Sequence, residues 1–172
     1  MNGYDSNDFV GNLTWHDTSA CIGGWNLTTT TITLGEDSIL PVAGETTVVE
    51  FQTAYPYIGF PATSWETIKT LVNSTYNLAN SDAFYCPANT GFNQYCYWRG
   101  VTCDQLDLTA NLTVTIGDYN FTIPLENLAS NTTYNSRWDC DLYLTQSKNT
   151  TQNMIRLGDP FFASFLPVFD VE

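Results

Sequence analysis

The clearest pattern in the chain is a regular alternation of apolar residues and threonines that begins near position 112. Leu, Val and Ile at positions 112, 114 and 116 alternate with threonine, and after Gly117-Asp118 the same period of two returns at Tyr119, Phe121 and Ile123. A period of two is typical of a strand with one buried face, and a short glycine-containing connection favours a tight turn. The pattern predicts a β-hairpin with its turn at residues 117–118.

Two further β-branched runs predict strands nearer the N-terminus. The run at residues 28–34 is ended by Gly35, and the run at residues 47–53 contains Val48, Val49 and Phe51. Such residues fit the pleated, half-buried surface of a sheet. We expect a strand at each run, with the second one buried, and a loop region at residues 81–103.

One helix is predicted between Thr63 and about Leu78. Thr63 and Glu66 have the T-x-x-E spacing of a capping box. The apolar residues that follow recur on one helical face: Trp65, Ile68, Leu71, Val72 and Tyr76. The expected fold class is all-β, with a mostly antiparallel sheet and one or two short helices.

Composition and charge narrow the classes of partner. The chain has 172 residues, of which 43% are hydrophobic, so one domain with a sizeable core is expected. The formal net charge is −13. Because an acidic surface repels phosphate groups, we expect no nucleic-acid partner and no docking on anionic lipid. The longest strongly apolar run, residues 160–169, is too short for a membrane span and contains two prolines.

N-glycosylation sequons indicate the compartment. Seven sequons of the form N-x-Ser/Thr begin at Asn12, Asn26, Asn73, Asn111, Asn120, Asn131 and Asn149. Such sites are used in the secretory pathway, where disulfides also form. We therefore expect a secreted or extracellular protein that carries N-linked glycans. Residues 1–5 do not read as a signal peptide, so we expect that an export signal was removed or that the chain is a fragment.

The cysteines agree with that compartment. There are five, none in a C-x-x-C pair, and the single histidine, His16, has no second histidine with which to bind a metal. A metal site is therefore not expected, and disulfides are preferred to free thiols. Two bridges leave one thiol over, and the sequence by itself leaves the pairing open.

Motifs of several common enzyme classes do not occur in the chain. We find no P-loop, GxGxxG, HExxH or GxSxG pattern, and no cofactor is expected. A lone histidine between Trp15 and Asp17 is more typical of a surface or packed residue than of a catalyst. A glycosidase carboxylate pair could be drawn from the 18 acidic residues, but nothing in the sequence selects a pair.

Four segments, in order along the chain, carry the motifs of one protein family. Residues 2–5 and 9–15 read Asn-Gly-Tyr-Asp and Phe-Val-Gly-Asn-Leu-Thr-Trp, residues 106–123 contain the hairpin, and residues 155–162 read Ile-Arg-Leu-Gly-Asp-Pro-Phe-Phe, followed by Leu-Pro-Val-Phe-Asp. Together they resemble the carboxy-terminal lobe of pepsin-like aspartic proteases. The resemblance implies a single pepsin-like lobe over residues 1–172, without the first lobe and the last strand.

The resemblance also locates the catalytic loop. In the family each lobe supplies one aspartate from an Asp-Thr-Gly loop, and the two carboxylates share a proton and activate a water. Here the loop falls at Gln52, Thr53 and Ala54, with Gln52 in place of the aspartate. An amide does not titrate and cannot act as general base. Arg156 stands where the resemblance implies an aliphatic residue under the loop, and a charge is hard to bury there. No catalytic residue is therefore implied.

A disulfide pattern follows from the resemblance as well. The family's second lobe has one bridge around the late hairpin, for which Cys86 and Cys140 match best by position, with Cys103 an alternative to Cys86. Cys96 and Cys103 would then close a small loop. Cys21 is left over as a free or intermolecular thiol.

Three functions are compatible with these features. The first is a non-catalytic secreted glycoprotein with a structural or self-assembling role, in a fibre or coat, whose partner is itself or another secreted chain; an unfilled final strand position would favour it. The second is a non-enzymatic binding module or inhibitor that uses the degenerate cleft near Tyr55, Tyr57 and Phe60. The third is part of an active aspartic protease, which requires an aspartate that this loop lacks.

Overall fold

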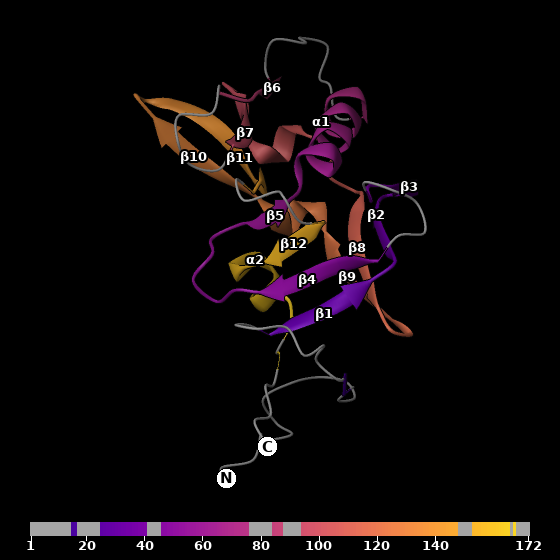
Figure 1. The fold of residues 1–172 in the computed structure, drawn as a ribbon. Coiled ribbons are helices and arrows are strands. Elements are labelled where there is room, and N and C mark those ends of the chain that lie inside the picture. The colour runs from indigo at the N-terminus through magenta and orange to yellow at the C-terminus, as the bar shows by residue number, and fades with distance from the viewer. Residues whose placement is uncertain are drawn as a thin grey trace.

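The computed structural model describes residues 15–16, 25–40, 46–75, 84–87, 94–147, 153–165 and 167 (Figure 1). Their strands are β1 (Asn26–Thr29), β2 (Thr31–Leu34), β3 (Asp37–Ser38), β4 (Thr47–Phe51), β5 (Ile58–Phe60), β6 (Phe84–Tyr85), β7 (Gln94–Arg99), β8 (Asn111–Ile116), β9 (Tyr119–Pro124), β10 (Ala129–Tyr134), β11 (Arg137–Gln146) and β12 (Met154–Leu157). The helices are α1 (Ala62–Thr75), α2 (Asp159–Phe162) and the 3-10 turns η1 (Cys103–Gln105) and η2 (Leu125–Leu128). The fold is mostly β with two short α-helices, as expected.

The strands form two sheets. The larger has the order β1-β4-β12-β5-β11-β7-β6, and the smaller has the order β3-β2-β8-β9. Most neighbours are antiparallel, but β12 runs parallel to β4, and β11 runs parallel to β5. The two parallel pairs lie in the middle of the larger sheet, so they place segments from distant parts of the chain side by side.

Strand β11 is the longest and pairs with three strands. On one edge its first half pairs with β10, from Arg137 to Leu142, and its second half pairs with β5, from Leu144 to Gln146. Strand β7 occupies the other edge. Figure 1 shows the β10 and β11 ribbons projecting together from the centre of the molecule.

The predicted hairpin is confirmed. Strands β8 and β9 pair from Asn111 with Pro124 to Ile116 with Tyr119, around the turn at Gly117. The apolar side chains of β8 are buried, as the alternation predicts. His16 packs against this hairpin, with its ring centroid 5.7 Å from that of Tyr119.

The single strand expected at residues 28–34 is wrong, because the run divides between the two sheets. Strand β1 joins the larger sheet beside β4, and β2 joins the smaller one beside β8. The Thr31 amide donates to Thr29 Oγ1 at 3.2 Å, and that hydroxyl donates to the Thr115 carbonyl. A threonine side chain that bonds to nearby backbone competes with a continuous ladder, which accounts for the bend at Thr30.

Helix α1 begins at Ala62, and the predicted capping box is wrong. The Trp65 amide donates to the Pro61 carbonyl at 2.9 Å, so Thr63 already lies inside the first turn. Proline needs no amide partner at a helix start, which makes Pro61 a suitable residue there. The predicted apolar face is present: Trp65 is buried with Ile68 and Val72 in the core. Tyr76 lies outside the described residues.

Strands and helices enclose one continuous core. Its largest fully buried side chains include Trp65 from α1, Trp98 from β7, Phe60 from β5 and Phe161 from α2. Each such side chain contributes roughly 2–3 kcal/mol of transfer free energy. Across the described ranges, no helix is long and apolar enough to cross a membrane.

Candidate functional site

The segment that the resemblance assigns to the catalytic loop, residues 52–54, lies at the end of β4. This strand ends at Phe51, and the next residues turn back toward β5. The Gln52 amide donates to the Leu157 carbonyl at 3.0 Å, and the Tyr55 amide donates to the Gln52 carbonyl at 3.2 Å. The loop is thus held between β4 and the parallel strand β12, which brings residues 52–54 and 155–162 together as the resemblance implies.

Gly158 allows two backbone segments to approach each other closely beside this loop. A Cβ on Gly158 would lie 2.0 Å from the Tyr55 carbonyl oxygen and 2.4 Å from that of Tyr57. The Asp159 amide donates to the same Tyr55 carbonyl at 2.7 Å. Contacts of that length exclude any side chain. The Gly-Asp pair in the sequence therefore marks a close backbone approach.

The loop itself presents polar and apolar groups but no titratable one. The side chains of Gln52, Thr53 and Ala54 are all exposed. An amide and a hydroxyl can donate and accept hydrogen bonds, but neither exchanges a proton with water near neutral pH. In the described part of the chain, no group of three or more His, Cys, Asp or Glu could hold a metal ion.

Arg156 forms an ion pair that the sequence analysis did not find. Its Nε lies 2.8 Å from Glu50 Oε2, and the two residues are register partners on β12 and β4. The two side chains are 22% and 24% exposed. The charge is therefore balanced at the surface of the sheet rather than buried unpaired under the loop. The signal that could have found Glu50 is the parallel pairing, which a single sequence does not display.

Three aromatic residues expected to line the cleft have different environments. Phe60 is fully buried in the core, so its expected place in a cleft is wrong: β5 is covered on both faces. Tyr55 is also buried, and its ring meets that of Tyr57 edge-on, with the ring centroids 6.1 Å apart. Tyr57 is half-buried and stacks on Tyr95 of β7, with ring centroids 6.4 Å apart and planes 13° apart.

Tyr57 belongs to a larger group of tyrosines, which we call the tyrosine face. It consists of Tyr57, directly before β5, and of Tyr85, Tyr95, Tyr97 and Tyr143 on β6, β7 and β11. Tyr85 and Tyr95 are exposed, and the other three are half-buried. Tyr95 stacks on Tyr97 at 6.2 Å, and Tyr97 meets Tyr85 edge-on at 5.5 Å. Tyr143 lies 6.4 Å from Tyr57. The prediction of a loop at residues 81–103 is therefore wrong where β6 and β7 run.

One carboxylate lies on the tyrosine face. Asp141 of β11 is the register partner of Tyr97 and is half-buried. Burial raises the pKa of the Asp141 carboxyl, the hydrogen bond from Thr132 opposes that shift, and the charge of Asp139 adds to it. Burial also raises the pKa of Tyr57, with Tyr95, Asp141 and Tyr143 contributing. Asp141 and the tyrosines around Tyr57 are thus electrostatic neighbours.

Asp139, two residues earlier on the same strand, is neutralised by the chain itself. Arg137 Nε and Nη2 donate to its two oxygens, each at 2.8 Å, and the Gly100 amide donates to Oδ1 at 2.8 Å. The bidentate bond to Arg137 is the main cause of the lowered pKa of the Asp139 carboxyl. No lysine or arginine of the described residues pairs with Asp141.

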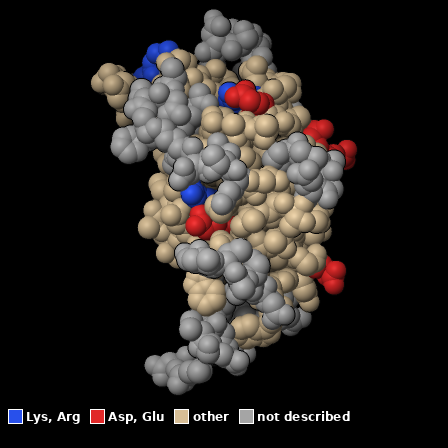
Figure 2. Space-filling model, in the orientation of Figure 1, with Lys and Arg blue, Asp and Glu red and all other residues tan. Residues whose placement is uncertain are grey.

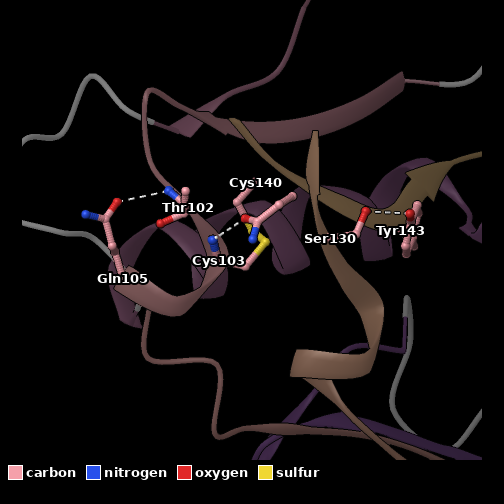
Figure 3. Close-up of a disulfide and its surroundings, with 7 residues drawn as sticks. Thr102, Cys103, Gln105, Ser130, Cys140 and Tyr143 are labelled. Atoms are coloured by element: carbon pink, nitrogen blue, oxygen red, sulfur yellow. Dashed lines mark hydrogen bonds between the residues drawn. A yellow bond between two sulfur atoms is a disulfide. The ribbon is translucent and has the colours of Figure 1, made fainter. Parts of the chain in front are cut away.

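The structure pairs the cysteines differently from the preferred expectation. Cys103 bonds to Cys140 (Figure 3), and Cys86 bonds to Cys96. The pairing of Cys86 with Cys140 is wrong, and so is that of Cys96 with Cys103, whereas the alternative partner of Cys140 is the one present. The reason is local: β6 and β7 are antiparallel neighbours, so Cys86 follows in register opposite Cys96. Cys21 lies outside the described residues.

Figure 3 also shows how the chain is held around the Cys103–Cys140 bridge. The Cys103 amide donates to Asn131 Oδ1 at 2.7 Å, and the Thr102 amide donates to Gln105 Oε1 at 2.9 Å. The hydroxyls of Ser130 and Tyr143 lie 2.6 Å apart on β10 and β11. These contacts anchor η1 and β10 against β11, the strand that contains Asp141.

The sequons differ in exposure. Four of the asparagines have exposed side chains: Asn73, Asn111, Asn120 and Asn131. Asn26 is only 7% exposed, in β1. Asn12 and Asn149 lie outside the described residues. The fold therefore makes four sequons accessible and encloses one.

Comparison with known proteins gives one match. The family model described as eukaryotic aspartyl protease matches residues 1–172. No curated protein matches the chain. The match spans the hairpin as well as the loop at Gln52 and the Gly-Asp segment at residue 158, and the fold brings the last two together. The chain therefore belongs to the eukaryotic aspartyl protease family.

Proposed function

We propose that this family member is a non-catalytic, secreted and N-glycosylated protein. The observation that carries the proposal is Gln52, which lies in the loop between β4 and β12 where the family resemblance implies the aspartate. An amide there cannot share a proton with a second carboxylate or activate a water. The disulfides and the exposed sequons support an origin in the secretory pathway.

A peptidase assay tests the loss of catalysis. The chain is incubated between pH 3 and pH 6 with a mixture of unlabelled peptides, and fragments are sought by mass spectrometry. We expect no cleavage by the wild-type chain, and no change with Gln52→Ala. Cleavage that is blocked by pepstatin and abolished by Gln52→Ala, but retained by Thr53→Ser, would refute the proposal.

A structural or self-assembling role is the first candidate for what the protein does instead. It is motivated by the odd number of cysteines, of which four form the two bridges and leave Cys21. The particle mass of the native, non-reduced chain tests it: a ladder of subunit masses supports assembly. A single mass near one glycosylated chain of 19.2 kDa opposes it. The net charge of −13 works against close packing of identical copies.

A binding role is the second candidate, and the described surface favours it. The tyrosine face exposes large aromatic rings on a rigid sheet that is fixed by both disulfides. Tyrosine supplies contact area at a low cost in conformational entropy, and it is enriched at binding surfaces. Tyr57, one of the residues expected in the cleft, is also part of the tyrosine face and follows Gln52 by five positions. The tyrosine face therefore begins close to the loop at Gln52.

A further inference from the structure

We propose that the tyrosine face with Asp141 is a docking site for an extended, basic segment of another protein. A lysine or arginine side chain of the partner would lie over the rings of Tyr57 and Tyr95 with its charge toward Asp141. This inference deepens the binding role proposed above and rests on it, but it does not depend on whether catalysis is lost.

The first support is a cation–π contact that the chain itself forms on this face. At one end of the face, the guanidinium of Arg99 lies over the ring of Tyr85, with Cζ 5.2 Å from the ring centroid. A cation at that distance is attracted by the negative charge of the ring face. The tyrosine face therefore already accommodates a guanidinium where the chain supplies one.

At the other end of the face, no lysine or arginine of the described residues lies over a ring. The half-buried Asp141 is the register partner of Tyr97 and an electrostatic neighbour of Tyr57, whose ring lies 6.4 Å from those of Tyr95 and Tyr143. The interactions of Asp141 within the described residues are a hydrogen bond from Thr132 and repulsion by Asp139. A partly desolvated carboxylate beside ring faces is complementary to a cation, because each group gains more attraction as water is excluded. Asp139 shows the contrast, since Arg137 already neutralises it.

The spacing of the rings fits an extended peptide. Tyr95 and Tyr97 are two positions apart on β7, and their centroids are 6.2 Å apart. Alternate side chains on one face of an extended chain repeat at about 6.5–7 Å. A peptide with a basic residue at every second position would place successive cations over successive rings.

Charge identifies the occupant as a different protein. The chain has five lysines and arginines against 18 acidic residues, and the basic residues are isolated from one another in the sequence. A second copy therefore offers no basic segment. On the face that Figure 2 shows, acidic and basic side chains are scattered over a mostly uncharged described surface. Because the acidic side chains are scattered, removing a single carboxylate can distinguish a specific cation site from general attraction to an acidic protein.

The test measures binding of a fluorescein-labelled peptide, Gly-Lys-Gly-Lys-Gly-Lys, by anisotropy in 0.15 M salt, which screens long-range attraction. We expect Asp141→Asn to weaken binding about fivefold or more. Asp118→Asn removes the same charge from the exposed hairpin turn and is the matched control. We expect it to change the affinity less than twofold.

Ring contacts are tested separately. Tyr95→Ala should weaken binding to a similar degree, whereas Tyr95→Phe keeps the ring and should retain it. Tyr119→Ala removes an exposed tyrosine from β9 and should have no effect. The unfolding midpoint of each variant shows whether it is folded, and the isosteric Asp141→Asn keeps the test informative if Tyr95→Ala is unstable.

Several outcomes would overturn the inference: equal weakening by Asp141→Asn and Asp118→Asn, equal affinity for an acetyl-lysine peptide, or no binding. Preference for a neutral oligosaccharide such as cellohexaose would overturn it in favour of a saccharide site. Peptide cleavage in the same samples that pepstatin blocks and Gln52→Ala abolishes would refute the non-catalytic proposal and leave the docking site intact. Absent binding without fragments would leave the non-catalytic proposal intact.

Discussion

Arg156 and Glu50 face each other across two parallel strands, with Nε and Oε2 2.8 Å apart. The pair lies directly before the Gly-Asp segment on one strand and before the loop at Gln52 on the other. An aliphatic residue at position 156, which the family resemblance implies, would leave Glu50 without this partner. Arg156 and Glu50 are therefore coupled through the geometry of the sheet.

A double-mutant cycle on this pair measures that coupling. We expect Arg156→Leu and Glu50→Gln together to cost less than the sum of the single changes, with a coupling free energy of about 1 kcal/mol from urea unfolding. Lys69 and Glu66 form an i, i+3 pair on the exposed side of α1 and serve as control. Their coupling should be about 0.3–0.5 kcal/mol. Equal coupling in the two pairs would contradict the burial argument.

Replacing Gly158 should destabilise the fold strongly. Gly158→Ala places a Cβ against the carbonyl oxygens of Tyr55 and Tyr57, which are backbone atoms and cannot rotate away. We expect a loss of about 3 kcal/mol in the free energy of unfolding. Gly35→Ala is the control, because its φ of +62° is strained but its Cβ meets only Ala110 at 3.9 Å. That change should cost about 1 kcal/mol. A larger loss of stability for Gly35→Ala than for Gly158→Ala would contradict the close backbone approach at Gly158.

The two disulfides should differ in their contribution to stability. Cys103 and Cys140 are 37 residues apart, and Cys86 and Cys96 are 10 apart. In the chain-entropy account, removal of the longer loop costs about 4 kcal/mol and of the shorter one about 3 kcal/mol. Serine pairs at each bridge, compared by chemical denaturation, check this order. Non-reducing peptide mapping that links Cys86 to Cys140 would contradict the pairing itself.

Asp139 and Asp141 should have opposite effects on stability as pH changes. The pKa of the Asp139 carboxyl is lowered in the folded state, mainly by its hydrogen bonds from Arg137, so its contribution is present at neutral pH and is lost as pH falls through that value. The pKa of the Asp141 carboxyl is raised, mainly by burial, so its ionised form is unfavourable at neutral pH, and the penalty is relieved as pH falls.

Urea unfolding at pH 7 and pH 3 separates the two carboxyls. At pH 7, Asp139→Asn should destabilise the chain, and Asp141→Asn should stabilise it. Both differences should shrink as pH falls toward 3: the one at Asp141 shrinks first because the pKa of its carboxyl is raised, and the one at Asp139 shrinks later because the pKa of its carboxyl is lowered. A stabilising effect of Asp139→Asn at pH 7 would be inconsistent with its bonds to Arg137 and Gly100.

Glycan occupancy should follow exposure. Glycopeptide mapping of the secreted chain should find glycans at Asn73, Asn111, Asn120 and Asn131, whose side chains are exposed. It should find Asn26 unmodified, because this side chain is enclosed in β1 beside β4. A glycan at Asn26 in folded, secreted material would contradict the enclosed position of this side chain in β1.

How much of the fold could be predicted depended on contrast between the two faces of each strand. The hairpin at β8 and β9 was predictable because apolar residues alternate with threonine. Strand β7 was not, because its inner positions are Cys96 and Trp98 and its outer ones are Tyr95 and Tyr97. All four are apolar or aromatic, so the alternation does not appear in a hydrophobic and polar pattern.

The candidate site was predictable only where a linear motif existed. The segments at Gln52 and Gly158 were located from sequence, and the fold places them together. Glu50 was missed as the partner of Arg156, and so was Asp141 beside Tyr97, since each pair depends on strand neighbours far apart in the chain. The cysteine pairing was wrong for a local reason: β6 and β7, where a loop was expected, pair and bring Cys86 opposite Cys96.

Strand β11 has a consequence for how this protein can change over evolutionary time. A slip of one position would turn Leu142 and Leu144 outward and Tyr143 inward, but the covalent bond at Cys140 holds the alignment. With the inner positions fixed, the half-buried outer residues at 141 and 143 can be exchanged while the strand keeps its alignment. The scaffold can thus acquire new specificities by exchanging outer side chains alone.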